Sequence, residues 1–247
     1  MSALAIAVVA IGVLWACSQY WLAPIVIKTG HPLTPHITDL HPVAASDVHP
    51  GFGGVLDQYR ASLQALGFVP APILTNRAQS SPSYVQLYEH PRHGDVATVI
   101  VLPDPEQPLP ANLVGFTTLV GGVRLRTLNS AIPSTFPTPP GNETARFPWE
   151  RDPARLYALH RARVKRSGRR PEAIRVGDPV AYQRQEEAAG PKNWVSSGYA
   201  VWDGAELRAT WKGAFCMPYR LLFPWKHVNE WRNEALRQRL LPEAGLA

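Results

Sequence analysis

Apolar residues dominate the beginning of the chain. Residues 3–22 are apolar or small apart from a polar group at residues 18–20, and no charged side chain precedes Lys28. Because a helix rises by about 1.5 Å per residue, about twenty such residues span the roughly 30 Å of a bilayer's hydrocarbon core. The pattern therefore predicts a single transmembrane helix over residues 1–27, and Pro24 is expected to end it.

The same stretch allows two other interpretations. A cleaved secretory signal is disfavoured, because no Lys or Arg precedes the apolar run and the run is longer than such signals require. Residues 14–17, LWAC, resemble the lipobox of bacterial lipoproteins, in which Cys17 would be the lipid-attachment site. Against this, Trp15 stands where small residues are usual, and the apolar run continues to Ile27. We favour an uncleaved anchor and leave lipidation of Cys17 open.

The residues around the apolar run indicate how the helix lies in a membrane. Trp15, Tyr20 and Trp21 have amphipathic rings of the kind that collect at membrane–water interfaces. Lys and Arg near a span are retained on the cytoplasmic side. Only the α-amino group is available on one side, whereas Lys28 and a long basic domain follow on the other. We therefore expect a single-pass membrane protein with its N-terminus outside and its soluble domain in the cytoplasm.

Residues 28–50 show no hydrophobic periodicity and are rich in proline. They predict an extended tether between the membrane helix and the soluble domain, because proline and the residue before it favour extended backbone. The histidines of this stretch are not expected to bind a metal. Most of them directly precede proline, whereas metal ligands usually lie at short paired spacings on defined secondary structure.

The pattern then changes from a helical period to an alternating one. Apolar residues between Val55 and Leu66 recur at helical spacing, Gly67 suits the end of that helix, and the glycine-rich residues 51–54 before it predict a turn. Several short alternating or β-branched stretches follow, and Gly121-Gly122 indicates a hairpin. The strands are expected at residues 84–88, 96–102, 113–120 and 123–128. Residues 51–140 therefore predict an α+β subdomain, a short antiparallel β-meander with a helix on one face.

Residues 141–247 are predicted to form a second subdomain that is basic and mainly helical. Prolines indicate a loop over residues 130–150, and Asp152-Pro153 then combines a helix cap with a proline at the first helical position. Asp178-Pro179 repeats this start. The elements expected are a helix over residues 153–166, a helix from 179 that Gly190-Pro191 interrupts, a hairpin near 199–211, and a helix over 225–241.

Positive charge is concentrated in two segments. The formal net charge is +6, and Lys and Arg gather in residues 151–176 and 208–239, whereas residues 51–150 are nearly balanced. We expect this basic surface to contact an anionic surface. Lipid headgroups are favoured over nucleic acid, because aromatic side chains do not alternate with the basic ones in residues 151–176. The candidate contacts are Arg161, Arg163, Lys165, Arg166, Arg169, Arg170, Arg220, Lys226 and Arg232.

A second apolar stretch covers residues 215–231. It is too short to span a bilayer, and Pro218 and Pro224 are expected to break it. Two interpretations stay open: the stretch lies in the headgroup plane between basic residues, or its aromatic side chains form a core layer beneath the sheet. The interfacial aromatic candidates of the whole chain are Trp15, Tyr20, Trp21, Phe223 and Trp225.

Motifs that would identify an enzyme are absent from the sequence: there is no nucleophile elbow, zinc-protease, P-loop or dinucleotide pattern. Residues 88–95 form the densest polar group, which we interpret as a solvated turn. The candidate acid/base residues are His90, His93 and His160, and no metal or cofactor is expected. The polar residues of the hairpin at Gly121-Gly122, which are Arg124, Arg126, Thr127 and Asn129, are expected on its exposed face. The two cysteines, Cys17 and Cys216, do not suggest a disulfide framework.

Three functional hypotheses follow from these features. The first is a membrane-anchored, non-enzymatic accessory or interaction protein that presents a basic domain at the membrane surface, with the lipid bilayer and a membrane protein as partners. The second is a membrane-associated enzyme that acts on an anionic or lipid substrate. The third is a nucleic-acid-binding module, which would show binding that falls steeply with salt.

Overall fold

The computed structural model describes residues 3–30, 33–35, 39–76, 83–102, 111–204, 206–222 and 224–246. Phe223 and the tether histidines His31 and His36 lie outside these residues. The chain divides into two compact units. The anchor unit comprises Met1–Ile37, Pro133–Pro137 and Ala188–Glu230, and the sheet unit comprises Thr38–Ile132, Thr138–Glu187 and Trp231–Ala247. Each unit is thus assembled from several segments, and the segments on either side of residue 140 meet in the sheet unit.

The anchor unit begins with a long helix in three parts. These parts are α1 (Ala3–Cys17), the π-helical turn η1 (Ser18–Leu22) and α2 (Ala23–Thr29). Its other elements are β1 (Thr34–Pro35), the predicted hairpin of β10 (Ala200–Asp203) and β11 (Glu206–Ala209), and α6 (Trp211–Leu221). The strands form an antiparallel sheet in the order β1-β11-β10. The helices α5 (Pro179–Ser196) and α7 (Trp225–Leu240) supply residues to both units.

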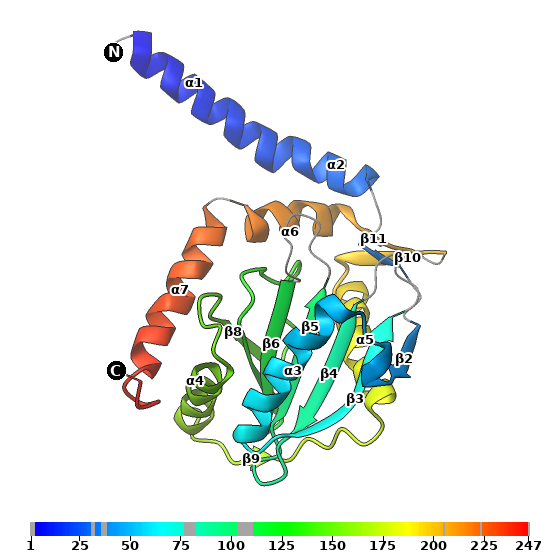
Figure 1. Ribbon diagram of the computed structural model, residues 1–247. Coiled ribbons are helices and arrows are strands. Elements are labelled where there is room, and N and C mark those ends of the chain that lie inside the picture. The colour runs from blue at the N-terminus through cyan, green and yellow to red at the C-terminus, as the bar shows by residue number, and fades with distance from the viewer. Residues whose placement is uncertain are drawn as a thin grey trace. The chain divides into compact units, whose positions relative to one another are not determined.

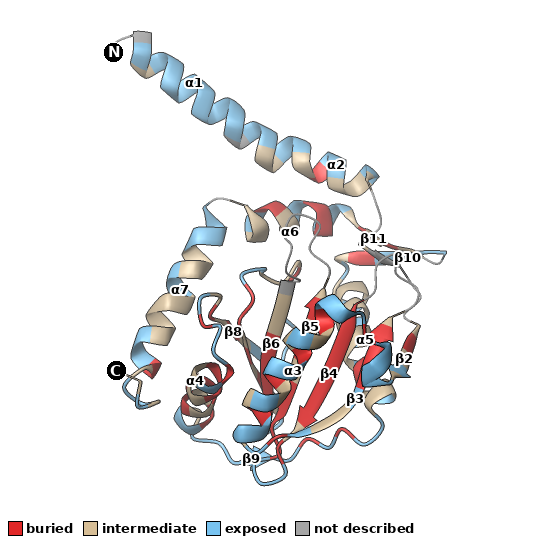
Figure 2. Ribbon diagram, viewed as in Figure 1, coloured by how far each residue is buried: buried red, intermediate tan, exposed pale blue. Residues whose placement is uncertain are grey.

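The N-terminal helix is long and apolar enough to cross a membrane, by length and composition, over Leu4–Thr29. Figure 2 shows α1 almost entirely in the colour of exposed residues. The expectation that Pro24 ends the helix is wrong. In η1 the N–H of Ala23 bonds to the carbonyl of Ser18, so that Pro24 falls in the first turn of α2, where a missing N–H forfeits little.

The sheet unit is built on one large sheet, whose central strands lie side by side in Figure 1. Its strands are β2 (Leu40–Val43), β3 (Val69–Asn76), β4 (Tyr84–Glu89), β5 (Val96–Leu102), β6 (Ala111–Val120), β7 (Val123–Leu128) and β8 (Asn142–Arg146). They neighbour one another in sequence order, antiparallel from β2 to β7 and parallel between β7 and β8. The short β9 (Pro171–Glu172) pairs with β6. The predicted antiparallel meander is therefore confirmed.

Apolar clusters cover both faces of this sheet. On one face, α3 (Pro50–Ala65) and α4 (Pro153–Arg166) pack on side chains such as Tyr88 and Phe116, and Leu240 of α7 joins the same core. On the other face, a smaller cluster includes Leu87 with Ile174. Figure 2 shows the central strands as the most buried part of the unit. The sheet is thus the middle layer, and its polar side chains are shielded wherever either cover is complete.

Five of the described strands lie where the sequence predicts none: β1, β2, β3, β8 and β9. β2 and the 3-10 turn η2 (Ala45–Asp47) fall within the predicted tether, and α3 begins already at Pro50, so the tether and the turn over 51–54 are wrong for the described residues. β3 contains Pro70 and Pro72, and its pairing with β4 shifts register between Pro70 and Ile73. β8 lies in the predicted loop. These strands have weak local signals, because proline is tolerated at edges and bulges and the pairing partner supplies the order.

The helices α4, α5 and α7 follow the predicted starts, whereas the sequence predicts no helix where α6 lies. Asp152 caps α4, with its Oδ1 accepting from the N–H of Ala154 at 2.9 Å, and α7 ends within a residue of the predicted boundary. The breaks at proline are wrong in two places, because α5 continues through Pro191 and α6 continues through Pro218. Pro218 is buried, so its packing offsets the hydrogen bond that its missing N–H cannot make.

Candidate functional site

A fully buried polar network lies between the sheet and α4. Asp95 precedes β5, Thr118 lies on β6, Thr127 on β7, and His160 on α4, and none of these side chains has any measurable exposure. Two turn features position Asp95: the N–H of His90 bonds to the Asp95 carbonyl at 2.8 Å, and the N–H of Ile174 bonds to the carbonyl of Gly94 at 2.9 Å. The residues come from distant parts of the sequence and meet only in the fold.

Asp95 is the charged centre of this network. Its Oδ2 accepts hydrogen bonds from the hydroxyl of Tyr157 at 2.7 Å and from Nη1 of Arg161 at 3.0 Å. Its Oδ1 accepts from the hydroxyl of Thr118 at 2.5 Å. A buried carboxylate requires both a counter-charge and donors for its lone pairs, and here Arg161, which is partly exposed, supplies the charge while two hydroxyls complete the shell.

The protonation of His160 follows from its neighbours. Thr118 spends its one proton on Asp95, so Nε2 of His160, 2.7 Å from the Thr118 oxygen, must be the donor there. Nδ1 is then an acceptor, and the hydroxyl of Thr127 donates to it at 2.9 Å. Thr127 in turn accepts from Nη1 of Arg163 at 2.9 Å. Each threonine hydroxyl donates one bond and accepts one, both ring nitrogens of His160 are engaged, and all bonds run in one direction, from the Arg163 cation to the Asp95 anion.

Burial in and around the network shifts the pKa values of three side chains. Burial lowers the pKa of His160 to about 3, against the opposing effect of Asp95. Burial also lowers the pKa of Arg163 to about 10, and it raises the pKa of Tyr157, with the adjacent Asp95 charge adding to the increase. His160 is therefore neutral at physiological pH. Since both ring nitrogens are engaged inside the fold, the network can orient and fix charge, but it offers no free proton acceptor at the surface.

The other two candidate histidines lie in the β4–β5 turn. Nδ1 of His90 accepts from the backbone N–H groups of Arg92 and His93, each at 3.3 Å, and burial lowers the pKa of His90. His93 is exposed, and its ring centroid lies 4.4 Å from that of His90. Tyr157 lies near both His90 and His160, with ring centroids 6.1 and 6.4 Å away. The turn is confirmed, but its description as solvated is wrong for Tyr88, His90 and Asp95, which are buried.

The hairpin residues divide by face. Thr127 and Asn129 are buried rather than exposed, so that expectation is wrong for them. Arg124 and Arg126 instead form ion pairs with Glu186 of α5, which lies over the opposite face of the sheet from α4. Strand alternation explains the difference, because Thr127 points toward α4 while its neighbours point away. Side chains on both faces are used, so neither side of this hairpin is simply solvated.

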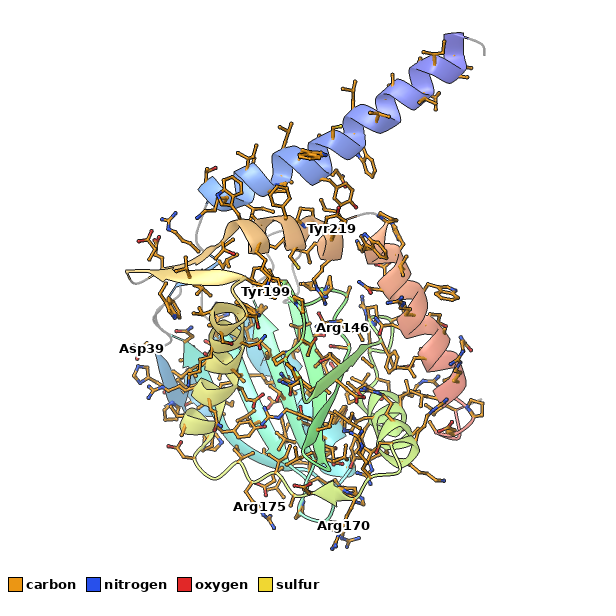
Figure 3. All side chains as sticks on the ribbon, turned by 180° about the vertical axis from the view of Figure 1, so that it is seen from behind. Asp39, Arg146, Arg170, Arg175, Tyr199 and Tyr219 are labelled. Atoms are coloured by element: carbon orange, nitrogen blue, oxygen red, sulfur yellow. The ribbon has the colours of Figure 1, made fainter. Side chains whose placement is uncertain are left out.

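The basic candidates differ in how far the fold engages them. Arg161 and Arg163 contribute to the buried network, and Arg166 pairs with Glu243 at 3.3 Å. Lys165, Arg169 and Arg170 are exposed, and Figure 3 shows Arg170 projecting from the sheet unit. In the anchor unit, Arg220 donates from Nε to the carbonyl of Ser134 at 3.2 Å, and Lys226 lies 4.0 Å from Glu230. Arg232 is exposed on the sheet unit.

The aromatic candidates concentrate in the anchor unit. Trp15, Trp21 and Trp225 are exposed, and the Tyr20 ring lies 5.1 Å from the ring of Tyr219 on α6. Figure 3 shows Tyr219 between α6 and the N-terminal helix. An exposed aromatic row along α6 consists of Phe215 and Tyr219, from the second apolar stretch, and Trp211, which is not among the aromatic candidates from the sequence. Their four-residue spacing is a signal that the sequence does carry, but it is recognisable only once a continuous helix through Pro218 is known.

Comparisons and metal chemistry add no assignment to these sites. Among the residues that the structure describes, no three His, Cys, Asp or Glu side chains gather as they would around a metal ion. No protein-family model, curated protein or solved structure matches the chain. Function therefore has to be argued from the molecule's own surfaces.

Proposed function

We propose that the chain is a single-pass membrane protein that acts as a non-enzymatic accessory or interaction protein, presenting its basic α+β domain at the bilayer surface. In this proposal the N-terminus lies outside and the domain lies in the cytoplasm, because Lys28 and the basic segments all follow the helix. The lipid bilayer is the primary partner, and a protein in the same membrane is the second.

The observation that carries this proposal is the exposure of apolar side chains along α1. Leu4, Ile11 and Leu14 are 75%, 66% and 69% exposed. No residue in the most apolar part of the candidate span is buried by the rest of the protein. Exposed apolar surface costs about 25 cal/mol per Å² in water. A helix of this length removes that cost by entering a hydrocarbon core.

The geometry of the histidines favours a non-enzymatic role over the enzymatic alternative. A general base needs a ring nitrogen within hydrogen-bond reach of a substrate. Both nitrogens of His160 are engaged by Thr118 and Thr127, and Nδ1 of His90 accepts from its own turn. The partners of His160 and of Nδ1 of His90 are thus supplied by the fold itself, which supports the non-enzymatic proposal, whereas His93 is exposed beside the His90 ring.

Membrane extraction of matched variants tests the proposal. Val8→Arg/Ile11→Arg places two charges in α1, where each costs about 2.5–3.5 kcal/mol at the centre of a span. The control, Val69→Arg/Ile132→Arg, makes the same changes at side chains of similar exposure outside the helix: Val8 and Ile11 are 61% and 66% exposed, and Val69 and Ile132 are 57% and 71% exposed.

The expected outcome is that wild type and the control stay with membranes in alkaline carbonate and leave only with detergent, whereas the α1 variant is largely released. Release of the wild-type chain by carbonate contradicts the anchor. Equal retention of the α1 variant and the control also contradicts it, because two arginines would then lie in a segment that does not enter hydrocarbon.

A further inference from the structure

The helix α6 has two chemically different faces. Trp211, Phe215 and Tyr219 recur every four residues, so they align on one side, and they are 52%, 40% and 53% exposed. The opposite side carries the small or buried residues Gly213 and Ala214. A helix of a water-soluble surface would expose its polar side, whereas α6 exposes a row of large aromatic rings.

The buried face fixes which side of α6 can turn outward. A Cβ on Gly213 would lie 2.0 Å from the carbonyl oxygen of Tyr199 and 3.2 Å from the ring of Phe136. Phe136 is itself fully buried, and its ring stacks on Tyr199 with centroids 5.4 Å apart. This close approach is open to glycine alone, so α6 is seated against Phe136 and Tyr199 and cannot rotate to hide its aromatic row.

The position of α6 within the anchor unit relates the aromatic row to the span. α6 packs against η1 and α2, the second half of the N-terminal helix, and Tyr219 contacts Tyr20. From Leu4 to Trp21 the helix rises about 26 Å at about 1.5 Å per residue, close to the hydrocarbon thickness of a bilayer. The apolar helix continues to Thr29, but a crossing that begins at Leu4 has used most of the hydrocarbon thickness at η1, so α2 and the neighbouring α6 would lie where the chain leaves the membrane.

The basic side chains of α6 are committed to the protein. Nζ of Lys212 donates to the carbonyl of Ser197 at 2.7 Å and lies 4.4 Å from the centre of the Tyr199 ring. Arg220 donates to the carbonyl of Ser134. The basic side chains of α6 are therefore engaged by the protein rather than offered to anionic headgroups, and the available surface of α6 is aromatic.

We propose that α6 lies in the plane of the membrane interface as a second contact with lipid, with Trp211, Phe215 and Tyr219 inserted at the level of the headgroups and the upper acyl chains. This inference rests on the proposed function, since it requires that the N-terminal helix spans the bilayer. Aromatic rings suit this depth because their apolar bodies and polar edges match the interface. The contact adds a fixed orientation to an anchor that would otherwise be free to tilt.

Fluorescence quenching in vesicles tests the depth of α6 with the full-length chain. The protein is reconstituted into phosphatidylcholine vesicles whose acyl chains carry bromine, and Trp211→Phe, Trp15→Phe and Trp194→Phe are compared with wild type. The signal lost in each variant reports one tryptophan. Trp194 is the control, because it lies in the same unit but packs on the buried Phe136 with ring centroids 5.3 Å apart.

The expected result is that the Trp211 signal is quenched at least about twofold more than the Trp194 signal, as for side chains that reach the acyl boundary. This quenching is expected to persist in high salt and without anionic lipid, because charge does not supply the contact. If Trp15 is quenched and Trp211 is not, the interfacial position of α6 is overturned while the anchor stands. If neither is quenched, both are overturned. Quenching of Trp211 that vanishes in high salt overturns the aromatic basis of the contact.

Discussion

The buried network of the sheet unit and the aromatic row of the anchor unit both place side chains where their polarity does not match the usual surroundings. In the network, Asp95 and His160 are polar groups placed inside the protein, and the fold supplies a partner for every one of their atoms in the chain that ends at Arg163. On α6, Trp211 and Tyr219 are large apolar groups placed outside, and the described chain leaves about half of each uncovered.

The difference separates residues that serve the fold from residues that serve its surroundings. A buried polar group whose hydrogen bonds are all made inside the protein has no free donor or acceptor for a ligand. An apolar surface that stays exposed is stabilised only when a lipid or a partner covers it. The polar side chains of the network in the sheet unit therefore find their partners within the fold. The apolar side chains of the anchor unit are not covered by the described chain, and the functional proposal therefore rests on this unit.

The largest expected effect comes from breaking the network at its charged centre. Asp95→Ala leaves Arg161, Tyr157 and Thr118 without their acceptor, and loss of one member of a buried ion pair lowers the free energy of unfolding by about 3–5 kcal/mol. Denaturant unfolding in detergent measures it. The control is Asp39→Ala, which removes a surface pair with His41 and should change stability by less than about 1 kcal/mol. Similar losses in both variants would show that the network carries no special weight.

A second effect depends on pH. The pKa of His160 is about 3 in the folded chain because of burial, whereas an unfolded histidine titrates near 6.5. The unfolded state alone therefore binds a proton between these values, so the stabilising contribution is complete above about pH 6.5 and declines as pH falls. From pH 6.5 to 4.5 the loss amounts to about 2–3 kcal/mol.

The variant His160→Gln isolates this effect. A glutamine amide can donate toward Thr118 and accept from Thr127, but it does not titrate. Unfolding free energies of both proteins are measured across this pH range, and the comparison uses slopes rather than absolute values. The wild-type chain should lose stability more steeply by about one proton per molecule. Parallel pH profiles would mean that His160 is not held neutral.

The close packing at Gly213 of α6 predicts that alanine substitutions at Gly213 and Gly53 change stability in opposite directions. Gly213→Ala forces a methyl group toward the Tyr199 carbonyl and is expected to destabilise the anchor unit by about 1–3 kcal/mol. Gly53→Ala, in α3, meets no atom within 4 Å and is expected to stabilise the chain by about 0.5–1 kcal/mol, because alanine has the higher helix propensity. Thermal unfolding checks both signs, and a neutral Gly213→Ala would show that α6 is free to shift.

The smallest expected effect concerns a single hydroxyl of the network. Thr118→Val removes the link between His160 and Asp95 and leaves the imidazole N–H unpaired, at a cost of about 1–2 kcal/mol. Thr118→Ser retains the hydroxyl and should recover most of that loss in the same unfolding assay. If valine and serine behave alike, the methyl group rather than the hydrogen bond is what matters at this position.

Local signals explain what the sequence could predict. The strands β4 to β7 were predictable because alternation and Gly121-Gly122 act between neighbours, and α4 because Asp152 caps it. β2, β3 and β8 were not, since they contain proline or loop-like residues and are ordered by partners far along the chain. The helix through Pro218 likewise depends on packing that no local rule describes.

The buried network escaped sequence analysis for a related reason. Alternation shows that Thr127 and Arg126 point to opposite faces, but it does not show that α4 covers one face and α5 the other. Asp95 lies in a turn that composition alone marks as solvated. Its direct partners Thr118 and Tyr157 are 23 and 62 residues away and come from different elements. The sequence marks His160 as an acid/base candidate, but its neutral state with both ring nitrogens bonded follows only from the geometry.

Protease protection of the full-length chain with a C-terminal tag tests the central claim most directly. Sealed vesicles of both orientations are treated with protease before and after permeabilisation. The account predicts that the tag sediments with the vesicles, survives in right-side-out vesicles until they are opened, and is digested at once in inverted ones. Digestion in sealed right-side-out vesicles would place the domain on the opposite side, and a tag that does not sediment with vesicles would contradict the anchor itself.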